Sequence, residues 1–327
     1  LIRVSDNSDP AVFDVSDAEF SIEIAPIPNW RLLTTGVDSS IICIDIVDTL
    51  ITYAGTKNGK VLKTTDGGET WSVLFTTHSG DVTSVFALNE QKAFIIVNSE
   101  TSTQIKRTLS FGASWGLVYE DTSPGAHLNA IHMFDEDNGF AIGNPVSGQW
   151  ILLNTTDGGA NWNSAGTLPQ NGSELGFNNS MDWIGSQTGW FGTDNGRVYN
   201  TTDGGTTWQS STTTFTNSTT VSFTDEQNGI ASGDATDRTS DGGLTWSAAP
   251  DQIGGTVAAG SSVKGVDGRW YFIFGNEVFK TEDKGDNIVM DYTQANTFNG
   301  IDVELVQIGE NHWVTGYAVG EMGTIAK

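Results

Sequence analysis

The 327-residue sequence has one cysteine, few basic residues and no long apolar segment, and each absence excludes a class of protein. Cys43 has no disulfide partner in the sequence and lies in the apolar run Ile41–Val47, which predicts a buried, unreactive thiol. No apolar run reaches the roughly 18 residues of a membrane-spanning helix. Fifteen Lys and Arg residues stand against forty Asp and Glu, a net charge of −25. Nucleic acids and anionic membranes are therefore not expected partners.

What the sequence does contain is a recurring eight-residue motif, Thr-x-Asp-x-Gly-x-x-Trp. Full copies occupy Thr64–Trp71, Thr155–Trp162, Thr201–Trp208 and Thr239–Trp246, and degenerate copies occupy Thr108–Trp115 and Thr281–Ile288. The pattern indicates a β-hairpin turn, because Gly adopts positive φ freely and the Asp carboxylate accepts backbone N–H bonds. The Trp would begin the outgoing strand as a large apolar plug. The residues expected to be structural are Asp66, Asp157, Asp203, Asp241 and Asp283, with Trp71, Trp162, Trp208 and Trp246.

The spacing of the motif predicts a repeat architecture. The Asp position, or the Ser that replaces it once, recurs at 66, 110, 157, 203, 241 and 283, so the gaps are 44, 47, 46, 38 and 42 residues. A four-stranded propeller blade needs a repeat of about this length. Seven apolar inner strands favour seven blades, with six or eight as alternatives. They fall near Ile41–Val47, Val82–Leu88, Leu128–Phe134, Ser180–Ile184, Thr219–Phe223, Val257–Lys264 and Gly300–Val306.

The two ends of the repeat region complete each other. The seventh repeat stops at Lys327 before its own motif, whereas Asn29–Leu33 matches the strand that follows each motif and has no blade before it. Pairing the two would leave no open sheet edge between the first and last blades. The predicted fold class is all-β: a seven-bladed β-propeller of four-stranded antiparallel blades, closed by an N-terminal outer strand.

Residues 1–24 fall outside the repeat and read as two short strands around a turn-rich middle. They resemble the closing strands, or the tail, of an Ig-like sandwich of the kind found in secreted surface proteins. Residues 25–28, Ala-Pro-Ile-Pro, indicate a stiff linker before a propeller at 29–327. The start at Leu1, without a signal peptide, favours a processed piece of a longer precursor.

The motif resembles the Asp-box, or BNR, repeat. With the segments that precede the boxes, such as Asn138–Gly143 and Thr188–Gly192, the chain from about residue 30 onward is similar to propellers of the photosystem II stability/assembly factor type. It is also similar to Asp-box repeats of surface proteins exported by type IX secretion. The resemblance implies that the boxes are structural and lie at the outer edge, away from a central binding face.

An enzymatic function stays open, and no catalytic residue is assigned. Asp-box sialidases gather three arginines around a carboxylate, but the six arginines here do not fall at inner-strand ends, so sialidase activity is not expected. A glycosidase needs only two carboxylates. The inner strands offer Asp45, Asp182, Asp302 and Glu304, for which lining a solvated channel is the simpler interpretation.

No metal site and no cofactor is predicted. Asp135–Gly139 resembles the start of a calcium loop, but no bidentate Glu follows at the required position. His127 and His132 are five residues apart on an expected strand and therefore face opposite sides.

Binding is expected on the face formed by the loops between second and third strands and the loops that enter the inner strands. Trp150 is included as an aromatic platform for a sugar. The candidate binding residues are Asp38, Asp81, His127, Asn144, Trp150, Asp194, Asn195, Glu277 and Glu321.

The sequence thus favours a secreted or cell-surface propeller that binds a protein or glycan, or has a structural role, within a larger protein. A polysaccharide-acting glycoside hydrolase that uses a carboxylate pair is the alternative. No direct insertion into a membrane is expected, and the oligomeric state and the ligand stay open.

Overall fold

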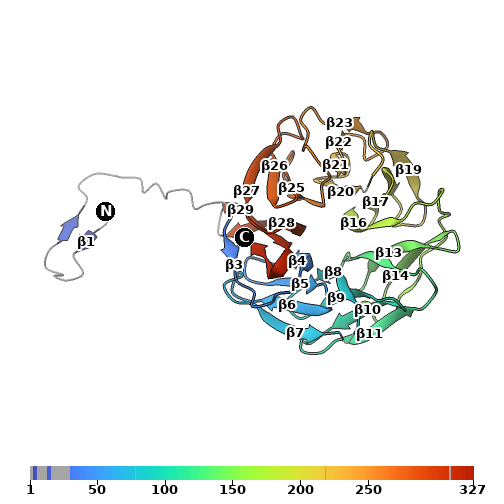
Figure 1. Ribbon diagram of the computed structural model, residues 1–327, viewed down its shortest axis with the longest axis horizontal. Helices are drawn as coiled ribbons and strands as arrows, with labels where there is room; N and C mark the ends of the chain where they lie inside the picture. The colour runs from blue at the N-terminus through green and yellow to red at the C-terminus, as the bar shows by residue number, and fades with distance from the viewer. Residues whose placement is uncertain (1–2, 6–12, 16–29, 78, 218, 309–310) are drawn as a thin grey trace.

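The structure is a computed structural model that describes residues 3–5, 13–15, 30–77, 79–217, 219–308 and 311–327. Seven four-stranded antiparallel sheets form a ring around a central channel (Figure 1). In the first six blades the strands pair in chain order from the channel outward. The prediction of a seven-bladed all-β propeller is confirmed.

The first three blades follow one another around the ring. Blade 1 contains β4 (Ile41–Ile46), β5 (Thr52–Thr56), β6 (Lys60–Thr64) and β7 (Ser72–Thr76). Blade 2 contains β8 (Asp81–Ala87), β9 (Ala93–Asn98), β10 (Thr103–Thr108) and β11 (Gly116–Asp121). Blade 3 contains β12 (Leu128–Met133), β13 (Gly139–Val146), β14 (Gln149–Thr155) and β15 (Asn163–Ser164).

Blades 4 to 6 keep the same order, and blade 7 differs. Blade 4 contains β16 (Gly176–Ile184), β17 (Thr188–Thr193), β18 (Arg197–Thr201) and β19 (Gln209–Thr212). Blade 5 contains β20 (Thr220–Phe223), β21 (Gly229–Ser232), β22 (Thr236–Thr239) and β23 (Ser247–Ala248). Blade 6 contains β24 (Ala259–Ser262), β25 (Trp270–Phe274), β26 (Glu277–Thr281) and β27 (Val289–Thr293). Blade 7 contains β28 (Phe298–Ile308), β29 (Asn311–Gly320), the 3₁₀ turn η1 (Glu321–Gly323), β30 (Ile325–Ala326) and β3 (Leu32–Leu33).

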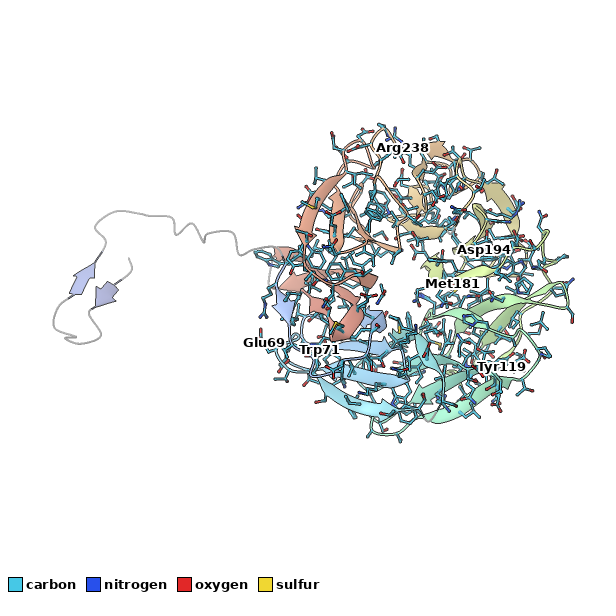
Figure 2. The ribbon with its side chains drawn as sticks, viewed as in Figure 1. Glu69, Trp71, Tyr119, Met181, Asp194 and Arg238 are labelled. Carbon is cyan, nitrogen blue, oxygen red and sulfur yellow. The ribbon has the colours of Figure 1, made fainter. Side chains whose placement is uncertain are left out.

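The core lies between the blades. The second strands β5, β9 and β17 are buried along their whole length, because each is covered on both faces by neighbouring blades. The outer strands, such as β7 and β11, contain only exposed and half-buried residues. Figure 2 shows the side chains filling the spaces between sheets. Hydrophobic burial between successive blades therefore holds the ring together.

Each full Asp box closes the hairpin from the third to the fourth strand with the same hydrogen bonds. In the first box, Thr64 Oγ1 donates to Asp66 Oδ1 (2.8 Å) and accepts from the buried Gly68 N–H (2.8 Å). The Asp66 carboxylate also accepts from Thr70 N (2.9 Å) and Thr70 Oγ1 (2.6 Å), and these bonds hold its pKa at about 2. Gly68 has a φ of 91°, in the left-handed region where a side chain would be strained.

The same arrangement recurs in the other boxes. Hydrogen bonds to the residue four positions later lower the pKa of the equivalent carboxylates. These acceptors are Asp157, Asp203, Asp241 and Asp283.

The box tryptophans pack across blade boundaries. Trp71 meets Tyr317 of blade 7 edge-on, with ring centroids 6.1 Å apart, and Trp162 meets Phe94 of blade 2 at 6.2 Å. Trp208 packs on Phe140 of blade 3 at 5.8 Å. Trp246 contacts Phe223 within its own blade at 6.0 Å, and its Nε1 donates to Ser211 Oγ of blade 4 (3.0 Å). The plug that begins each outgoing strand thus fills an inter-blade gap.

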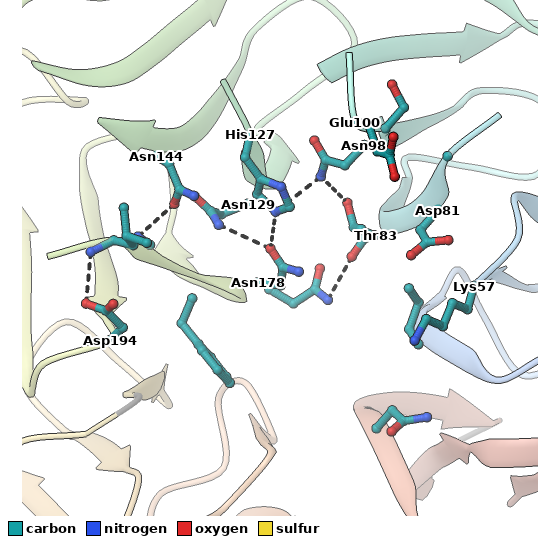
Figure 3. Close-up of a pocket in the computed structure, with 18 of the residues that line it drawn as sticks. Lys57, Asp81, Thr83, Asn98, Glu100, His127, Asn129, Asn144, Asn178 and Asp194 are labelled. Atoms are coloured by element: carbon teal, nitrogen blue, oxygen red, sulfur yellow. Dashed lines mark hydrogen bonds between the residues drawn. The ribbon is translucent and has the colours of Figure 1, made fainter. Parts of the chain in front are cut away.

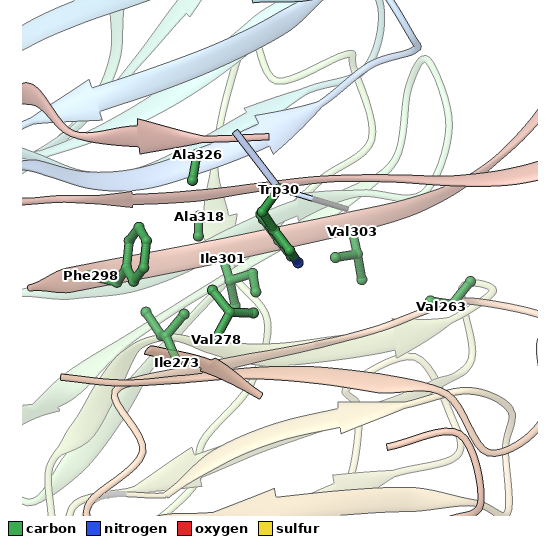
Figure 4. Packing of buried hydrophobic residues seen from close by; sticks show 9 residues of the cluster. All are labelled: Trp30, Val263, Ile273, Val278, Phe298, Ile301, Val303, Ala318 and Ala326. Carbon is green, nitrogen blue, oxygen red and sulfur yellow. The ribbon is translucent and has the colours of Figure 1, made fainter. Parts of the chain in front are cut away.

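The ring closes through the N-terminal outer strand. Leu32 pairs with Ala326 and Leu33 with Ile325, and Arg31 and Lys327 exchange backbone hydrogen bonds of 2.7 and 2.9 Å. Trp30 is buried among core residues of blades 6 and 7 (Figure 4). Its ring stacks on Tyr292 at 6.2 Å, and its Nε1 donates to Asp291 at 2.8 Å. Trp30 therefore occupies a position equivalent to the box tryptophans, facing the preceding blade.

The predicted domain boundaries remain predictions. The structure describes β1 (Arg3–Ser5) and β2 (Phe13–Val15) as an antiparallel pair. The rest of the Ig-like segment at 1–24, and the linker at 25–28, lie outside the described residues.

The prediction of a buried cysteine thiol is confirmed. Cys43 is buried, its Sγ donates to Val82 O (3.3 Å), and desolvation raises the pKa of the thiol far above its usual range. Within the described residues, no helix is long and apolar enough to cross a membrane.

Candidate functional site

A cavity of about 1140 Å³ opens at one end of the channel, and we call it the mouth cavity (Figure 3). Most of its walls come from the turns between the second and third strands of blades 1, 2 and 4 and from the segments that lead into the inner strands of blades 2 to 4. Ala258 of blade 6 and Asn299 of blade 7 line it as well. The Asp boxes lie at the opposite ends of these strands, since they follow each third strand. The mouth cavity is therefore on the face away from the boxes.

β-Bulges turn inner-strand side chains into the mouth cavity. In blades 1, 2, 3 and 7, the register between the inner and second strands skips one residue. Bulges re-aim side chains in this way next to functional sites in other proteins. In blade 4 the skip is longer, from Gly176 to Met181. The single skipped residues are Ile42, Thr83, Asn129 and Asn299, and all four line the cavity.

Side-chain amides form a network across the cavity wall. Asn98 Nδ2 donates to Thr83 Oγ1 (2.7 Å). Asn178 Oδ1 accepts from Asn129 Nδ2 (3.1 Å) and lies 2.9 Å from His127 Nε2. Because each carboxamide offers both donors and an acceptor, this part of the wall presents mixed hydrogen-bonding groups. The charged residues that also line the cavity are Lys57, Asp81, Glu100 and Asp194.

Asn179 separates the mouth from the channel below. Its backbone is in the left-handed region, with φ of 57°, and its Nδ2 donates to Thr83 O (3.1 Å) in blade 2. Asn179 lines both the mouth cavity and a smaller cavity of about 200 Å³ within the channel. The blade 4 bulge therefore reaches over the channel entrance.

The structure brings four of the candidate binding residues to the mouth cavity. His127 and Asn144 belong to the amide wall, and Asn144 Oδ1 accepts from Gly176 N (2.9 Å). Asp81 accepts from Asn58 N (2.9 Å) and Asp194 accepts from Leu175 N (2.8 Å), so both carboxylates also brace the loops that surround the cavity.

The other candidates lie elsewhere. Asn195 is next to the cavity, where its side chain accepts from Thr193 Oγ1 (2.8 Å). Asp38, Glu277 and Glu321 do not line the cavity. Trp150 is buried against Phe191 and Tyr199, so it presents no exposed platform to a sugar.

The main residues that sequence reasoning missed are amides on bulges and loops. They are Asn98, Asn129, Asn178, Asn179 and Asn299. The pair Asn178–Asn179, directly before the expected inner strand Ser180–Ile184, is the one sequence signal for them, since Asn tolerates the left-handed backbone.

Four carboxylates, one lysine and one histidine line the channel cavity. The carboxylates are the inner-strand acids Asp45, Asp182, Asp302 and Glu304, as expected from the sequence. Lys264 Nζ forms an ion pair with Asp182 at 2.5 Å. Desolvation lowers the pKa of His132 to about 4, so this ring is neutral at neutral pH.

Burial and mutual repulsion raise the pKa of three of these acids. Desolvation raises the pKa of Glu304 to about 7, and the charge of Asp302 adds to the effect. Desolvation likewise raises the pKa of Asp302 to about 6, against hydrogen bonds that favour its ionised form. The pKa of Asp45 is raised well above its usual range by burial and by Asp302. The ionised forms of Asp45, Asp302 and Glu304 are therefore unfavourable in this cavity.

Three of the acids also tie each inner strand to the next blade. Asp45 Oδ2 accepts from Ala87 N (2.7 Å), Asp182 Oδ2 from Phe223 N (2.6 Å), and Asp302 Oδ2 from Ile46 N (2.8 Å). Ser261 Oγ accepts from Val303 N (3.2 Å) in the same direction. A structural role thus accounts for these three acids; Glu304 makes no hydrogen bond to any described residue.

Metal binding has no support in the described part of the chain, where no group of three or more His, Cys, Asp or Glu side chains could hold an ion. Asp135, at the start of the calcium-like segment, instead caps a turn by accepting from Asp137 N (2.8 Å) and Asn138 N (2.7 Å).

The fold brings several of the few basic residues together. The sequence shows no basic cluster, but folding gathers four basic residues around a groove between blades 6 and 7, on the box side. They are Arg31, Arg269, Lys280 and Lys327.

Comparison with known proteins agrees with the fold. A family model described as "Photosynthesis system II assembly factor YCF48" matches residues 81–220. The chain is accordingly a BNR-type seven-bladed propeller that resembles this assembly-factor type. No curated protein matches the sequence.

Solved structures with the same fold have low sequence identity. A structure titled "YCF48 bound to D1 peptide" is 15% identical with a TM-score of 0.69, over 94% of this chain and 98% of that one. YCF48 from Cyanidioschyzon merolae is 15% identical with a TM-score of 0.66, over 91% and 98%. A GH74 xyloglucanase from Xanthomonas campestris is 11% identical with a TM-score of 0.64, over 91% of this chain and 53% of that one.

Proposed function

We propose that this propeller is a protein-binding module, and that the mouth cavity holds an extended segment of its partner. The amide lining of the cavity carries the proposal. Every residue of an extended peptide presents a backbone N–H and a C=O. Carboxamides can pair with both, so a wall of Asn side chains fits a peptide main chain without demanding a particular sequence.

The size and polarity of the cavity support a peptide. Its volume of about 1140 Å³ exceeds the roughly 300–1,000 Å³ typical of small-molecule pockets. Phe177 is the one aromatic ring besides His127 among the described residues that line it. Sugar-binding sites rely on stacking against exposed aromatic rings, so a glycan is the weaker candidate. The solved propeller with a bound D1 peptide is consistent with a peptide ligand on this fold.

The cellular setting is also a proposal: export to the cell surface as part of a larger protein. Its support is the strongly acidic composition, together with the resemblance to exported Asp-box proteins. Protease treatment of intact source cells, followed by immunoblotting of the propeller, tests this setting. Survival of the protein until the cells are lysed would contradict it.

Peptide and glycan arrays probed with the 1–327 chain test the binding proposal. Peptides are expected to bind, and Asn178→Ala should weaken binding threefold to tenfold, since one hydrogen bond contributes about 0.5–1.5 kcal/mol. Asn163→Ala, at an exposed position on β15, is the matched control and should have no effect. Selective binding of glycans, or equal peptide binding by both variants, would refute the proposal.

A polysaccharide hydrolase is the second candidate, because Asp302 and Glu304 have raised pKa values in a cavity. One of the two, Glu304, is free of hydrogen bonds to the described residues and would be the general acid. Reducing-end assays on a polysaccharide panel test this reading. Hydrolysis that disappears in Glu304→Gln would establish it, and the absence of hydrolysis would exclude it for those substrates.

A further inference from the structure

Five consecutive residues, Leu175–Asn179, line the mouth cavity, and we call them the mouth segment. The ladder between β16 and β17 does not fix their conformation, because the register skips from Gly176 to Met181 and leaves residues 177–180 without a partner in β17. Asn178, whose replacement is expected to weaken peptide binding, is exposed within this part. The conformation of the mouth segment must therefore come from contacts outside the ladder.

A buried ion pair lies directly before the mouth segment. Glu174 has a fully buried side chain, and its Oε2 pairs with Arg197 Nε at 3.0 Å. Its Oε1 accepts from Asn171 N (3.0 Å) and from the hydroxyl of Tyr199. Three donors thus surround the carboxylate, and two of them come from β18 of the same blade. Glu174 does not itself line the mouth cavity, so it has no direct contact with a bound partner.

Further hydrogen bonds lead from the ion pair into the mouth segment. Leu175 N and Gly176 N, the next two amides, donate to side chains of blades 4 and 3 (Figure 3). At the other end, Ser180 Oγ donates to Thr219 O (2.6 Å), directly before β20 of blade 5. The mouth segment is therefore fixed at both ends, while Asn178 stays exposed between them.

The pair of Glu174 with Arg197 fixes geometry more than it adds stability. Both charges lose their hydration on burial, and this loss offsets much of their attraction. A guanidinium and a carboxylate nevertheless bind in a defined relative orientation, which places the backbone on either side of Glu174. A binding segment that is already ordered loses less conformational entropy when its partner binds.

We propose that Glu174 is a positioning residue of the mouth cavity, and that its ion pair with Arg197 preorganises the mouth segment for the partner. The inference rests on the binding function proposed above, and it adds a residue that acts through Asn178 rather than on the partner itself. Without the charge of Glu174, the mouth segment has to be ordered during binding. Affinity then falls although every residue that touches the partner is unchanged.

Fluorescence polarisation tests the proposal, with a fluorescein-labelled copy of the array peptide that binds the wild-type 1–327 chain most tightly. Glu174→Gln keeps the shape of the side chain and removes its charge, so it should bind this probe at least about fivefold more weakly. Asp291→Asn is the matched control, because it breaks the ion pair with Lys280 (2.9 Å) on the box side, where the Asp291 side chain is 9% exposed. Both variants should lower Tm, but the control should bind the probe within about twofold of the wild type.

A milder pair of variants covers the case in which Glu174→Gln does not fold. Tyr199→Phe removes one hydrogen bond to Glu174 and keeps the ion pair and the packing of the ring, so it should weaken binding about twofold to threefold. Its control, Tyr53→Phe, removes a buried hydroxyl that donates to Glu90 O (2.8 Å) on the box side. The control should bind the probe like the wild type.

Hydrogen exchange measures the positioning without any ligand. The amides of residues 175–179 should exchange faster in Glu174→Gln than in the wild type, and their exchange should be unchanged in Asp291→Asn. Unchanged exchange in Glu174→Gln, or equal losses of affinity in each variant and its control, would overturn the proposal. Failure of the binding function gives a different result, in which the wild-type chain binds no array peptide or Asn178→Ala binds as tightly as the wild type. That result would overturn the role of Glu174 in binding as well.

Discussion

Replacing Glu304 with Gln should stabilise the propeller at pH 8. The Glu304 side chain lies in the channel cavity, facing Asp45, Asp302 and the ion pair of Asp182 with Lys264. It makes no hydrogen bond to the described residues, so the change removes a charge without removing a bond. Desolvation and the charge of Asp302 disfavour that charge, and they raise its pKa from 4.5 to about 7.

The expected size follows from linkage between protonation and folding. One pKa unit corresponds to about 1.4 kcal/mol, so the rise of the Glu304 pKa from 4.5 to about 7 gives an upper limit of roughly 3.5 kcal/mol. The protonation of Asp302 and Asp45 readjusts when Glu304 loses its charge. We therefore expect a gain below this limit, of about 1–3 kcal/mol in the free energy of unfolding at pH 8. In domains of 150–250 residues, each kcal/mol raises Tm by about 2–4 °C, and the shift is smaller in longer chains.

The raised pKa of Glu304 determines the direction in which the stability of the fold changes with pH. The folded state of the wild type keeps the Glu304 proton up to about pH 7, whereas the unfolded state loses it near pH 4.5. Wild-type stability should therefore rise as the pH falls from 8 to 5, and the Gln variant should show less of this rise. At pH 5 the two proteins should differ little.

Urea unfolding followed by tryptophan fluorescence, at pH 8, 7, 6 and 5, measures these free energies. Glu100→Gln, at an exposed position on the mouth, is the matched control and should leave the profile unchanged. A Glu304→Gln protein that is less stable than the wild type at pH 8, or that keeps the full pH dependence, would refute the account of the channel.

Three further predictions concern the boxes and the closure. Thr201→Val removes the acceptor of the buried Gly205 N–H, so it should lower the free energy of unfolding by about 1–3 kcal/mol in urea titrations; an unchanged midpoint would contradict this role. Hydrogen bonds hold the pKa of Asp157 at about 2 in the folded state. Its ionised carboxylate therefore stabilises the fold above about pH 4, and this stabilisation should be lost as the pH falls toward 2. The acid unfolding of Asp157→Asn should lack this part of the pH dependence. Trp30→Ala should cost about 3–5 kcal/mol as a core deletion, whereas the exposed Trp313→Ala should change Tm little, and equal effects would place the closing plug elsewhere.

The repeat architecture could be predicted from the sequence, because its signals are local. An Asp-Gly turn, its Thr and its Trp lie within eight residues, so the bonds of Thr64 to Asp66 and Gly68 are properties of one segment. Regular spacing of such segments then determines the number of blades. The closing role of Asn29–Leu33 follows from the same reasoning, since an outer strand without a blade matches a blade without an outer strand.

The binding surfaces could not be predicted in the same way. A bulge that turns Asn129 into the mouth cavity depends on the register between β12 and β13, and no residue pattern within one strand specifies that register. The burial of Trp150 depends on Phe191 and Tyr199 of the next blade, so its position beside a loop does not make it an exposed platform.

Charge shows the same division between sequence and structure. The net charge of −25 is a sum over the sequence, and it says nothing about where the few basic residues gather. Arg31 and Arg269 lie 238 positions apart and meet at one groove only because the ring closes. Local hydrogen bonding and periodicity therefore determined the fold of this protein, and contacts between distant segments decided where it can bind a partner.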